Sequence, residues 1–360
     1  MMLYQKGGAV FAEIQDQPRL WKEVLQSLHN RRQELQTWLK SENFGQVLFI
    51  GTGDAYGVAL SAAHILQLVS GLNTVALPAS EILYLRRPPY DSRIKTLVVA
   101  LSTNGECEDT HWALEKLRKL HTTCRALFIG GAVGKLGNPL TEQQILINDC
   151  LEEGPVATRC PSSMLLACMI ITAWISDKEV FMNELVKLPD AIDFKSLQDQ
   201  LQKAATIKPL PMHVTFLGSG PYLGAAVHGS LKVREMAAIG AEYQNPLEYR
   251  HGSHCWLTNQ TMVVTLVSDT FRDAELRTTF QLASTRAPRL LVSEQLDMQA
   301  QMRVDQAVQL ASGVSEISRI LLMFPVVQLL AFYMAISKGK NPDKPKHLEA
   351  AIEIKERPGV

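Results

Sequence analysis

Apolar runs of strand length alternate along this chain with longer stretches that repeat their apolar residues at helical spacing. Residues 48–50, 96–101 and 125–129 are almost wholly apolar, which is typical of parallel strands covered on both faces. Residues 109–120, between two of these runs, carry tryptophan and leucines at roughly helical spacing. The alternation predicts βαβ units and therefore an α/β fold, with a parallel sheet between two layers of helices.

The pattern occurs twice, which predicts two copies of one domain. Leu48–Gly53 reads LFIGTG, and Thr215–Gly220 reads TFLGSG 167 positions later. Each copy is expected to be a parallel-sheet αβα sandwich of the flavodoxin-like type. The predicted boundaries are 1–40 for an N-terminal helical segment, 41–194 for the first domain, 195–340 for the second domain and 341–360 for a C-terminal tail.

Charge and cysteine content narrow the class of protein. Lys plus Arg and Asp plus Glu number 36 each, without the basic face that a nucleic-acid-binding protein needs. The six cysteines form no CxxC pair, so we expect buried free thiols, a reducing compartment and no metal site. The longest apolar run, Ile320–Ile336, is interrupted by Pro325 and Gln328, which favours a buried helix and no membrane role. Met1–Gly8 lacks a secretory signal, so the expected location is cytoplasmic.

The loop after one predicted strand is the strongest sign of chemistry. Leu101–Thr110 reads LSTNGECEDT and lies where the strand ends and the next helix begins. Backbone N–H groups at a helix start favour a phosphate, and Ser102, Thr103, Asn104 and Thr110 would add donors. An ordinary helix N-cap and turn fits the same residue types, so the loop by itself leaves both interpretations open.

Gly51-Thr52-Gly53 forms a second glycine-rich turn. It resembles part of a dinucleotide-binding fingerprint, but the full motif needs glycine where Tyr56 stands, and no ribose-binding acid is evident. A nicotinamide enzyme is therefore disfavoured. Thr52 and the Gly53 N–H suit a sugar phosphate at the carboxyl ends of the strands instead.

These motifs resemble the sugar isomerase (SIS) domain family. The resemblance rests on Gly51–Gly53, on Ser102-x-x-Gly105-Glu106-x-x-Asp109-Thr110 and on Val156–Thr158. Two such domains in tandem, with Lys232-x-x-Glu235, His251-Gly252, Pro345-x-x-Leu348 and Glu13-Ile14-x-x-Gln17-Pro18, resemble the isomerase half of glucosamine-6-phosphate synthase. Nothing of the size of that synthase's glutaminase domain precedes residue 1, so a glutamine-fed synthase is not expected.

The resemblance implies catalytic roles for three residues of this sequence. Glu235 matches the enolisation base, Lys232 its neighbour one turn earlier, and His251 the residue assigned to ring opening, with His254 as a rival. Without the resemblance, an exposed i,i+3 salt bridge is the favoured interpretation of Lys232 and Glu235. In enzymes of this type the histidine comes from the neighbouring subunit, which implies a homodimer with a shared active site.

The resemblance also implies a substrate-binding set and no cofactor. The implied phosphate-binding and sugar-binding residues are Thr52, Gly53, Ser102, Thr103, Asn104, Thr110, Val156, Ala157 and Thr158. The corresponding loop of the second copy, Val267–Phe271, lacks both the glycine and the glutamate. Only the first copy is therefore expected to bind phosphate.

Departures from the family pattern shape the expected reaction. Thr103 and Asn104 stand where the synthase has glutamine and serine, and Ala350 stands where it has an imine-forming lysine; neither Lys346 nor Lys355 matches that position. A free ketone needs such a lysine, whereas a substrate that carries nitrogen forms its own imine. We therefore expect an enzyme that releases ammonia or an amine from an amino-sugar or glycated-amine 6-phosphate, a deaminase or deglycase.

Two alternatives stay open at this stage. An aldose–ketose phosphosugar isomerase also needs no lysine, because it works through an enediol. A non-catalytic sugar-phosphate sensor is the other alternative, but neither end of the chain carries a basic recognition helix, and a sensor has no use for a base such as Glu235.

Overall fold

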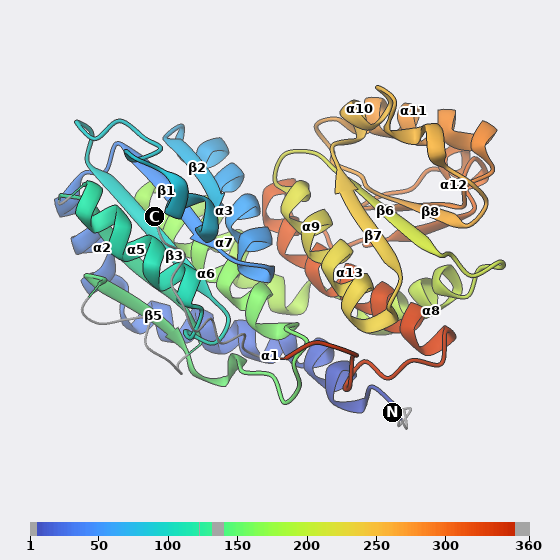
Figure 1. Cartoon of the computed structure of the whole chain (residues 1–360), viewed down its shortest axis with the longest axis horizontal. Coiled ribbons are helices and arrows are strands. Elements are labelled where there is room, and N and C mark those ends of the chain that lie inside the picture. Colours follow the sequence, from blue (N-terminus) through green and yellow to red (C-terminus); the bar gives the residue numbers. More distant parts are fainter. Residues whose placement is uncertain (1–5, 122, 132–139, 350–360) are drawn as a thin grey trace. The chain divides into compact units, whose positions relative to one another are not determined.

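The computed structural model describes residues 6–121, 123–131 and 140–349, and each of two compact units has its own sheet (Figure 1). The first-sheet unit comprises Arg19–Glu152 and Arg159–Val186, within the described residues. The second-sheet unit comprises residues 6–18, Glu153–Thr158 and Lys187–Leu348. The boundaries expected from the sequence, at 40/41, 194/195 and 340/341, stay predictions.

The first-sheet unit alternates strands and helices as the apolar runs predict. Its three central strands, β1 (Gln46–Gly51), β3 (Thr96–Ser102) and β4 (Arg125–Gly131), are buried. Helices cover them: α3 (Asp54–Ser70) packs on β1 and on α6 (Arg159–Ile175), and α5 (Glu108–Leu120) packs on β3. After α1 (Gly8–Asn30), which contributes to both units, the elements are α2 (Arg32–Glu42), β1 (Gln46–Gly51), α3 (Asp54–Ser70), β2 (Asn73–Pro78), α4 (Ala79–Tyr84), β3 (Thr96–Ser102), α5 (Glu108–Leu120), β4 (Arg125–Gly131), β5 (Gln143–Ile147), η1 (Asn148–Cys150), α6 (Arg159–Ile175) and α7 (Glu179–Lys187).

The second-sheet unit repeats the order of the first. Along the chain, α7 and α8 (Phe194–Ala205) connect the two sheets. The elements are η2 (Leu188–Asp190), α8 (Phe194–Ala205), β6 (His213–Gly218), α9 (Tyr222–Lys232), η3 (Val233–Ala237), β7 (Gly240–Gln244), α10 (Pro246–Tyr249), η4 (Ser253–Trp256), β8 (Thr261–Leu266), α11 (Arg272–Gln281), η5 (Leu282–Thr285), β9 (Arg289–Ser293), α12 (Met298–Met302), β10 (Gln306–Gln309) and α13 (Glu316–Ser337).

Both sheets are parallel and have the same strand order. The first runs β2-β1-β3-β4-β5, and the second runs β7-β6-β8-β9-β10. In each unit the first strand lies between the second and the third, so the strand order reverses there. The carboxyl ends of β1 and β3, and of β6 and β8, therefore form a topological switch point, where open α/β sheets bind ligands. The two tandem flavodoxin-like sandwiches expected from the sequence are confirmed.

The fifth strand of each sheet was not expected from the sequence. β5 begins with Gln143 and Gln144, and β10 runs from Gln306 to Gln309, so neither is an apolar run. Both are edge strands, and an edge strand needs less burial than a central one. Their polar composition therefore hid them from a reading based on apolar runs.

The longest apolar helix, α13, is a core helix of the second-sheet unit. It is the one helix among the described residues that is long and apolar enough to cross a membrane, but 89% of its most apolar window is buried inside the protein. It packs against α8, α9 and η3, shown in red beside yellow α9 in Figure 1. The buried helix expected at Ile320–Ile336 is confirmed.

Candidate active site

The Ser102–Thr110 loop joins β3 to α5 and folds back on itself. The Ser102 hydroxyl accepts a hydrogen bond from the Gly105 N–H at 3.1 Å, and the Asn104 Oδ1 accepts one from the Glu106 N–H at 3.1 Å. The N-cap position of α5 is Cys107, and no side chain caps it. The structure thus contains the turn of the alternative interpretation, closed by Ser102 and Asn104, but not its side-chain N-cap.

Thr110 places a buried hydroxyl at the start of α5. Its side chain is fully buried, and its Oγ1 has no hydrogen-bond partner among the described residues. Leaving a buried polar group unpaired costs about 1–3 kcal/mol, so the arrangement favours a ligand oxygen at this position. The hydroxyl lies in the third residue of α5, where free N–H groups and the helix dipole favour an anion.

Thr52 and Gly53 lie at the same edge of the first sheet as this loop. Both residues are exposed between β1 and α3, and β1 pairs in parallel with β3, so their carboxyl ends share one edge. Gly53 has φ of +58° and nothing within 4 Å of the place a Cβ would occupy, which suits glycine on conformational grounds. The structure thus places the five predicted phosphate-binding side chains and Gly53 at one edge of the first sheet.

The Ser102–Thr110 loop is packed against Gly130 and Cys160, two residues that were not predicted from the sequence. A Cβ on Gly130 would lie 1.9 Å from the Ser102 carbonyl oxygen, so only glycine permits β4 to pass this close. The Cys160 thiol donates to the Thr103 carbonyl at 3.2 Å, and the Cys150 sulfur lies 2.9 Å from that of Cys160. Burial raises the pKa of Cys160 well above its usual value, so this thiol stays protonated and able to donate.

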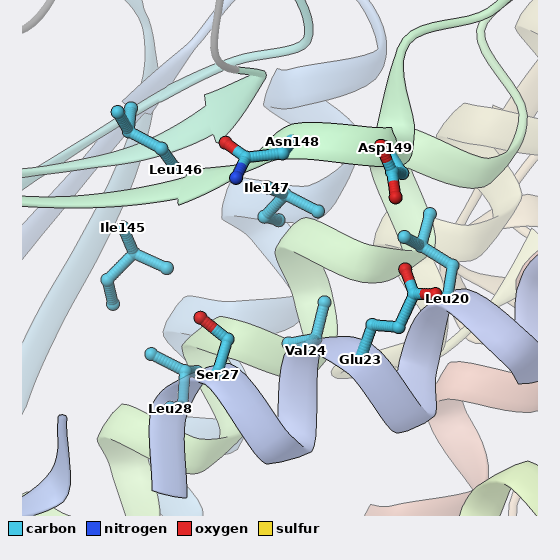
Figure 2. Close-up of a pocket in the computed structure, with 10 residues that line it drawn as sticks. All are labelled: Leu20, Glu23, Val24, Ser27, Leu28, Ile145, Leu146, Ile147, Asn148 and Asp149. Carbon is cyan, nitrogen blue, oxygen red and sulfur yellow. The ribbon is translucent and has the colours of Figure 1, made fainter. Parts of the chain in front are cut away.

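A pocket elsewhere in the first-sheet unit contains none of these residues. It lies between α1 and β5, with a volume of about 130 Å³ and an apolar floor that includes Val24 and Ile147 (Figure 2). Glu23 and Asp149 lie at its rim. Because none of the predicted site residues lines it, this pocket is separate from the candidate site. Among the described residues, no group of His, Cys, Asp and Glu side chains is arranged to hold a metal ion.

In the second copy, a carboxylate of the chain itself fills the corresponding loop. Glu275 stands at the position of Thr110, 165 residues later. Its Oε2 accepts hydrogen bonds from the Ser268 N–H at 2.7 Å and the Ser268 hydroxyl at 3.0 Å. The side chain is fully buried, and burial raises its pKa. An internal carboxylate thus uses the N–H and hydroxyl donors of Ser268, in agreement with the expectation that only the first copy binds phosphate.

Lys232 and Glu235 form a buried ion pair. Lys232 ends α9, Glu235 lies in the π-helical turn η3, and the Lys232 Nζ is 2.5 Å from the Glu235 Oε2. The lysine side chain is 0% exposed and the glutamate side chain 12%. An exposed salt bridge, the interpretation favoured by spacing alone, is therefore wrong. Single π-helical turns next to α-helical residues, as in η3 after α9, are frequent at functional sites.

Ala157 belongs to the same group of residues. The Lys232 Nζ donates to the Ala157 carbonyl at 2.9 Å, so one ammonium holds both the carboxylate and the segment Val156–Thr158. Val156 and Thr158 are fully buried. The structure thus brings the predicted sugar-binding segment next to the predicted base within the second-sheet unit.

His251 lies apart from this group, on an exposed turn after α10. Its backbone N–H donates to the Glu248 carbonyl at 2.9 Å, and its side chain is exposed. The rival, His254, is half-buried, and its Nδ1 lies 3.3 Å from the Tyr249 carbonyl. The C-terminal positions Ala350 and Lys355 fall outside the described residues, and Lys346 is exposed.

Comparison with known proteins finds a family model that matches part of the chain and relatives that match nearly all of it. The SIS domain model matches residues 41–157. The glutamine–fructose-6-phosphate aminotransferase (isomerizing) of Thermococcus kodakarensis is 24% identical over 95% of this chain, and that of Caldanaerobacter subterraneus is 24% identical over 97%. The chain spans 57% and 60% of the length of these two relatives.

Solved structures share the fold over nearly the whole chain. Glucosamine-6-phosphate deaminase from Thermotoga maritima is 25% identical, with a TM-score of 0.75, and the match covers 95% of this chain and 98% of that one. Tagatose-6-phosphate ketose/aldose isomerase from Escherichia coli is 20% identical, with a TM-score of 0.81 over 96% and 98%. The chain therefore contains an SIS domain at residues 41–157 and is homologous over nearly its full length to the isomerase half of glucosamine-6-phosphate synthase.

Proposed function

We propose that this chain is a cytoplasmic enzyme that shifts a proton between C1 and C2 of an amino-sugar or glycated-amine 6-phosphate and releases ammonia or an amine. The observation that carries the proposal is the buried Lys232–Glu235 pair beside the Ala157 carbonyl. The names of the similar proteins, a deaminase, ketose/aldose isomerases and aminotransferases of phosphosugars, support the substrate class.

Glu235 is the base in this proposal. Moving a proton between adjacent carbons requires an ionised carboxylate that takes the proton and returns it one carbon away. Lys232 keeps the carboxylate ionised and holds its orientation, because the ammonium is buried and bonded on two sides. A cation at this point also stabilises negative charge that develops on the substrate oxygen.

The reaction ends in hydrolysis because the substrate carries its own nitrogen. After ring opening, proton transfer converts an aldose amine into a ketimine, or a ketose amine into an aldimine, and water then releases the amine. No lysine imine is required, in agreement with Ala350 at the position where the synthase has its lysine.

Substituting Ser102 by alanine is expected to weaken sugar-phosphate binding. Charge-assisted hydrogen bonds contribute about 1.5–3 kcal/mol, so we expect the KM to rise about 10- to 100-fold with a smaller change in kcat. Steady-state kinetics with the phosphosugar found in the experiment below gives both constants.

Ser268→Ala is the matched control in the second copy. It removes a hydroxyl that donates to Glu275 at 3.0 Å, so a stability cost similar to that of Ser102→Ala is expected without a change in KM. An equal rise in KM for the two variants would contradict a phosphate site restricted to the first copy.

The function is tested by NMR of the purified protein in D₂O. Glucosamine 6-phosphate, fructose 6-phosphate and a fructosamine 6-phosphate are incubated separately, and phosphorus and proton spectra are followed. Release of ammonia or an amine from a nitrogen-bearing substrate is the expected result. Interconversion and deuterium exchange confined to fructose 6-phosphate would instead make the protein an aldose–ketose isomerase.

We further propose a homodimer in which His251 acts in the site of the partner. The exposed His251 side chain is available to a second copy of the chain. Mixing inactive Glu235→Gln protein with inactive His251→Asn protein is expected to restore activity, because hybrid dimers contain one intact site. If subunits exchange and activity does not return, the two residues act within one chain.

A further inference from the structure

A chain of buried polar side chains runs through the core of the second-sheet unit. Gln17 of α1, His228 of α9 and Gln328 of α13 are each 0% exposed. The Gln17 Nε2 donates to the Gln328 Oε1 at 2.8 Å, and the Gln328 Nε2 lies 2.8 Å from the Thr158 carbonyl oxygen and 2.9 Å from the His228 Nε2. Most polar groups buried this deeply are hydrogen-bonded; of the four amide atoms of Gln17 and Gln328, the Gln17 Oε1 has no partner among the described residues.

The carbonyl oxygens of Ile14 and Thr158 fix the direction of the hydrogen bonds between these side chains. A carbonyl oxygen only accepts, so the Gln328 atom that faces Thr158 has to be its NH₂ group. The same holds for Gln17, whose Nε2 also faces the Ile14 carbonyl at 2.9 Å. Each amide is therefore held in one of its two orientations, and the second proton of the Gln328 NH₂ group points at His228.

His228 is consequently held in one protonation state. Its Nε2 has to accept the proton of the Gln328 NH₂ group, which requires a neutral ring protonated at Nδ1. The ring also stacks on Phe324, with centroids 4.8 Å apart and planes at 29°. A proton on Nε2 would face the NH₂ group and would force the Gln328 amide to turn over. That rotation would break the hydrogen bond from Gln328 to the Thr158 carbonyl.

Two consecutive carbonyl groups of the sugar-binding segment are thus held from two helices. Lys232 of α9 holds the Ala157 carbonyl at 2.9 Å, and Gln328 of α13 holds the Thr158 carbonyl at 2.8 Å. Glu13 of α1 adds a third contact, because its Oε1 accepts from the Glu153 N–H at 2.6 Å. The segment 153–158 has no regular secondary structure, so these side chains determine its path.

We propose that Gln328 is a positioning residue for substrate binding, which holds the Val156–Thr158 backbone in its binding conformation through an NH₂ group oriented by Gln17 and by neutral His228. The proposal rests on the proposed function for its effect on substrate. Gln328 itself touches backbone and not substrate, so its effect reaches the substrate through Thr158. The hydrogen-bonding part of the proposal concerns the free protein and is measurable without any turnover.

Gln328→Leu tests the proposal, with Thr265→Val as the matched control. Thr265 forms a buried hydroxyl pair with Thr279 at 2.8 Å in the same unit, so its loss reports the general cost of a buried hydrogen bond. Gln17→Leu is the milder variant: it keeps both donors of Gln328 but frees the amide to turn over, and it serves if Gln328→Leu does not fold.

Three measurements follow. Long-range proton–nitrogen NMR of ¹⁵N-histidine-labelled protein, with His228 assigned by substitution, should show neutral His228 protonated at Nδ1 in wild type and a mixed or changed form in the Gln328 and Gln17 variants. Amide hydrogen exchange of the peptide covering 153–158 should be faster in these variants and unchanged in Thr265→Val. The KM for the phosphosugar should rise about tenfold in Gln328→Leu, with kcat less affected.

Each result separates this inference from the proposed function. His228 protonated at Nε2 in wild type, or exchange at 153–158 that is equal in Gln328→Leu and Thr265→Val, overturns the inference whatever the enzyme catalyses. If the spectra and exchange agree with it but no phosphosugar is turned over, the proposed function has failed and the positioning of the segment stands. A KM in Gln328→Leu equal to that of Thr265→Val overturns the link to substrate binding.

Discussion

Glu235→Gln is expected to lower kcat by at least about 10³-fold while sugar-phosphate binding persists. Glutamine has nearly the shape of glutamate and still accepts a hydrogen bond from Lys232, but it cannot take a proton from carbon. Phosphate binding is assigned to other residues, so the dissociation constant of the phosphosugar should change little. Isothermal titration calorimetry with the variant, together with initial rates, measures the two quantities on the same preparation.

Glu34→Gln provides the control with the same sequence spacing. Glu34 forms an i,i+3 ion pair with Arg31, with 2.9 Å between the Glu34 Oε1 and the Arg31 guanidinium. The Glu34 side chain is 51% exposed and the Arg31 side chain 34%. Exposed pairs of this kind contribute about 0–1 kcal/mol, so this variant should retain wild-type activity and nearly wild-type stability. Loss of phosphosugar binding in Glu235→Gln with turnover intact would refute the assignment of the base.

The repeated sheets were predictable because central parallel strands leave a strong pattern. A strand with helices on both faces has to be apolar throughout, so β1, β3, β6 and β8 are readable from composition. The edge strands β5 and β10 contain glutamines and were missed. Their pairing depends on neighbours that lie elsewhere in the sequence, which periodicity cannot supply.

The candidate site was predictable where chemistry is local in sequence. Ser102–Thr110 and Lys232-x-x-Glu235 are short motifs: the first folds into a turn closed by the Ser102 hydroxyl, and the second forms an ion pair. The roles assigned to these residues stay predictions. Spacing alone could not tell a buried ion pair from an exposed one, because burial of Lys232 comes from packing with residues far along the chain. A closer reading of the second copy offers a usable signal: a glutamate, Glu275, at the position of Thr110.

The supporting contacts had no local signal. Cys160 reaches the Ser102–Thr110 loop from 57 positions away, and Gln328 reaches Thr158 from 170 positions away. Neither residue belongs to a short motif, and a glutamine within an apolar helix was noted only as an interruption. Such residues are found from the hydrogen bonds of buried polar atoms, because each of these atoms has to be paired once the chain is folded.

Lys232→Met is expected to lower kcat by about 10²-fold or more and to shift the acid limb of the pH–rate profile to higher pH. Methionine has a similar length but no charge, so Glu235, which is 12% exposed, loses its cation. A buried carboxylate without a partner cation takes up a proton more readily. Less of the base is then ionised at neutral pH, and raising the pH restores part of the rate. Initial rates across pH measure this shift.

Denaturant unfolding separates the effect of breaking the Lys232–Glu235 ion pair from the effect of removing both of its charges. Removing one partner of a buried ion pair costs about 3–5 kcal/mol, since the other charge is left uncompensated. Lys232→Met and Glu235→Gln should therefore both unfold at lower denaturant than wild type, and the double variant should recover part of that loss, because neither charge remains. The double variant should stay inactive, since no base is present. If Lys232→Met keeps both wild-type stability and the wild-type pH profile, the ammonium has no part in holding Glu235 ionised, and the role proposed for the pair is wrong.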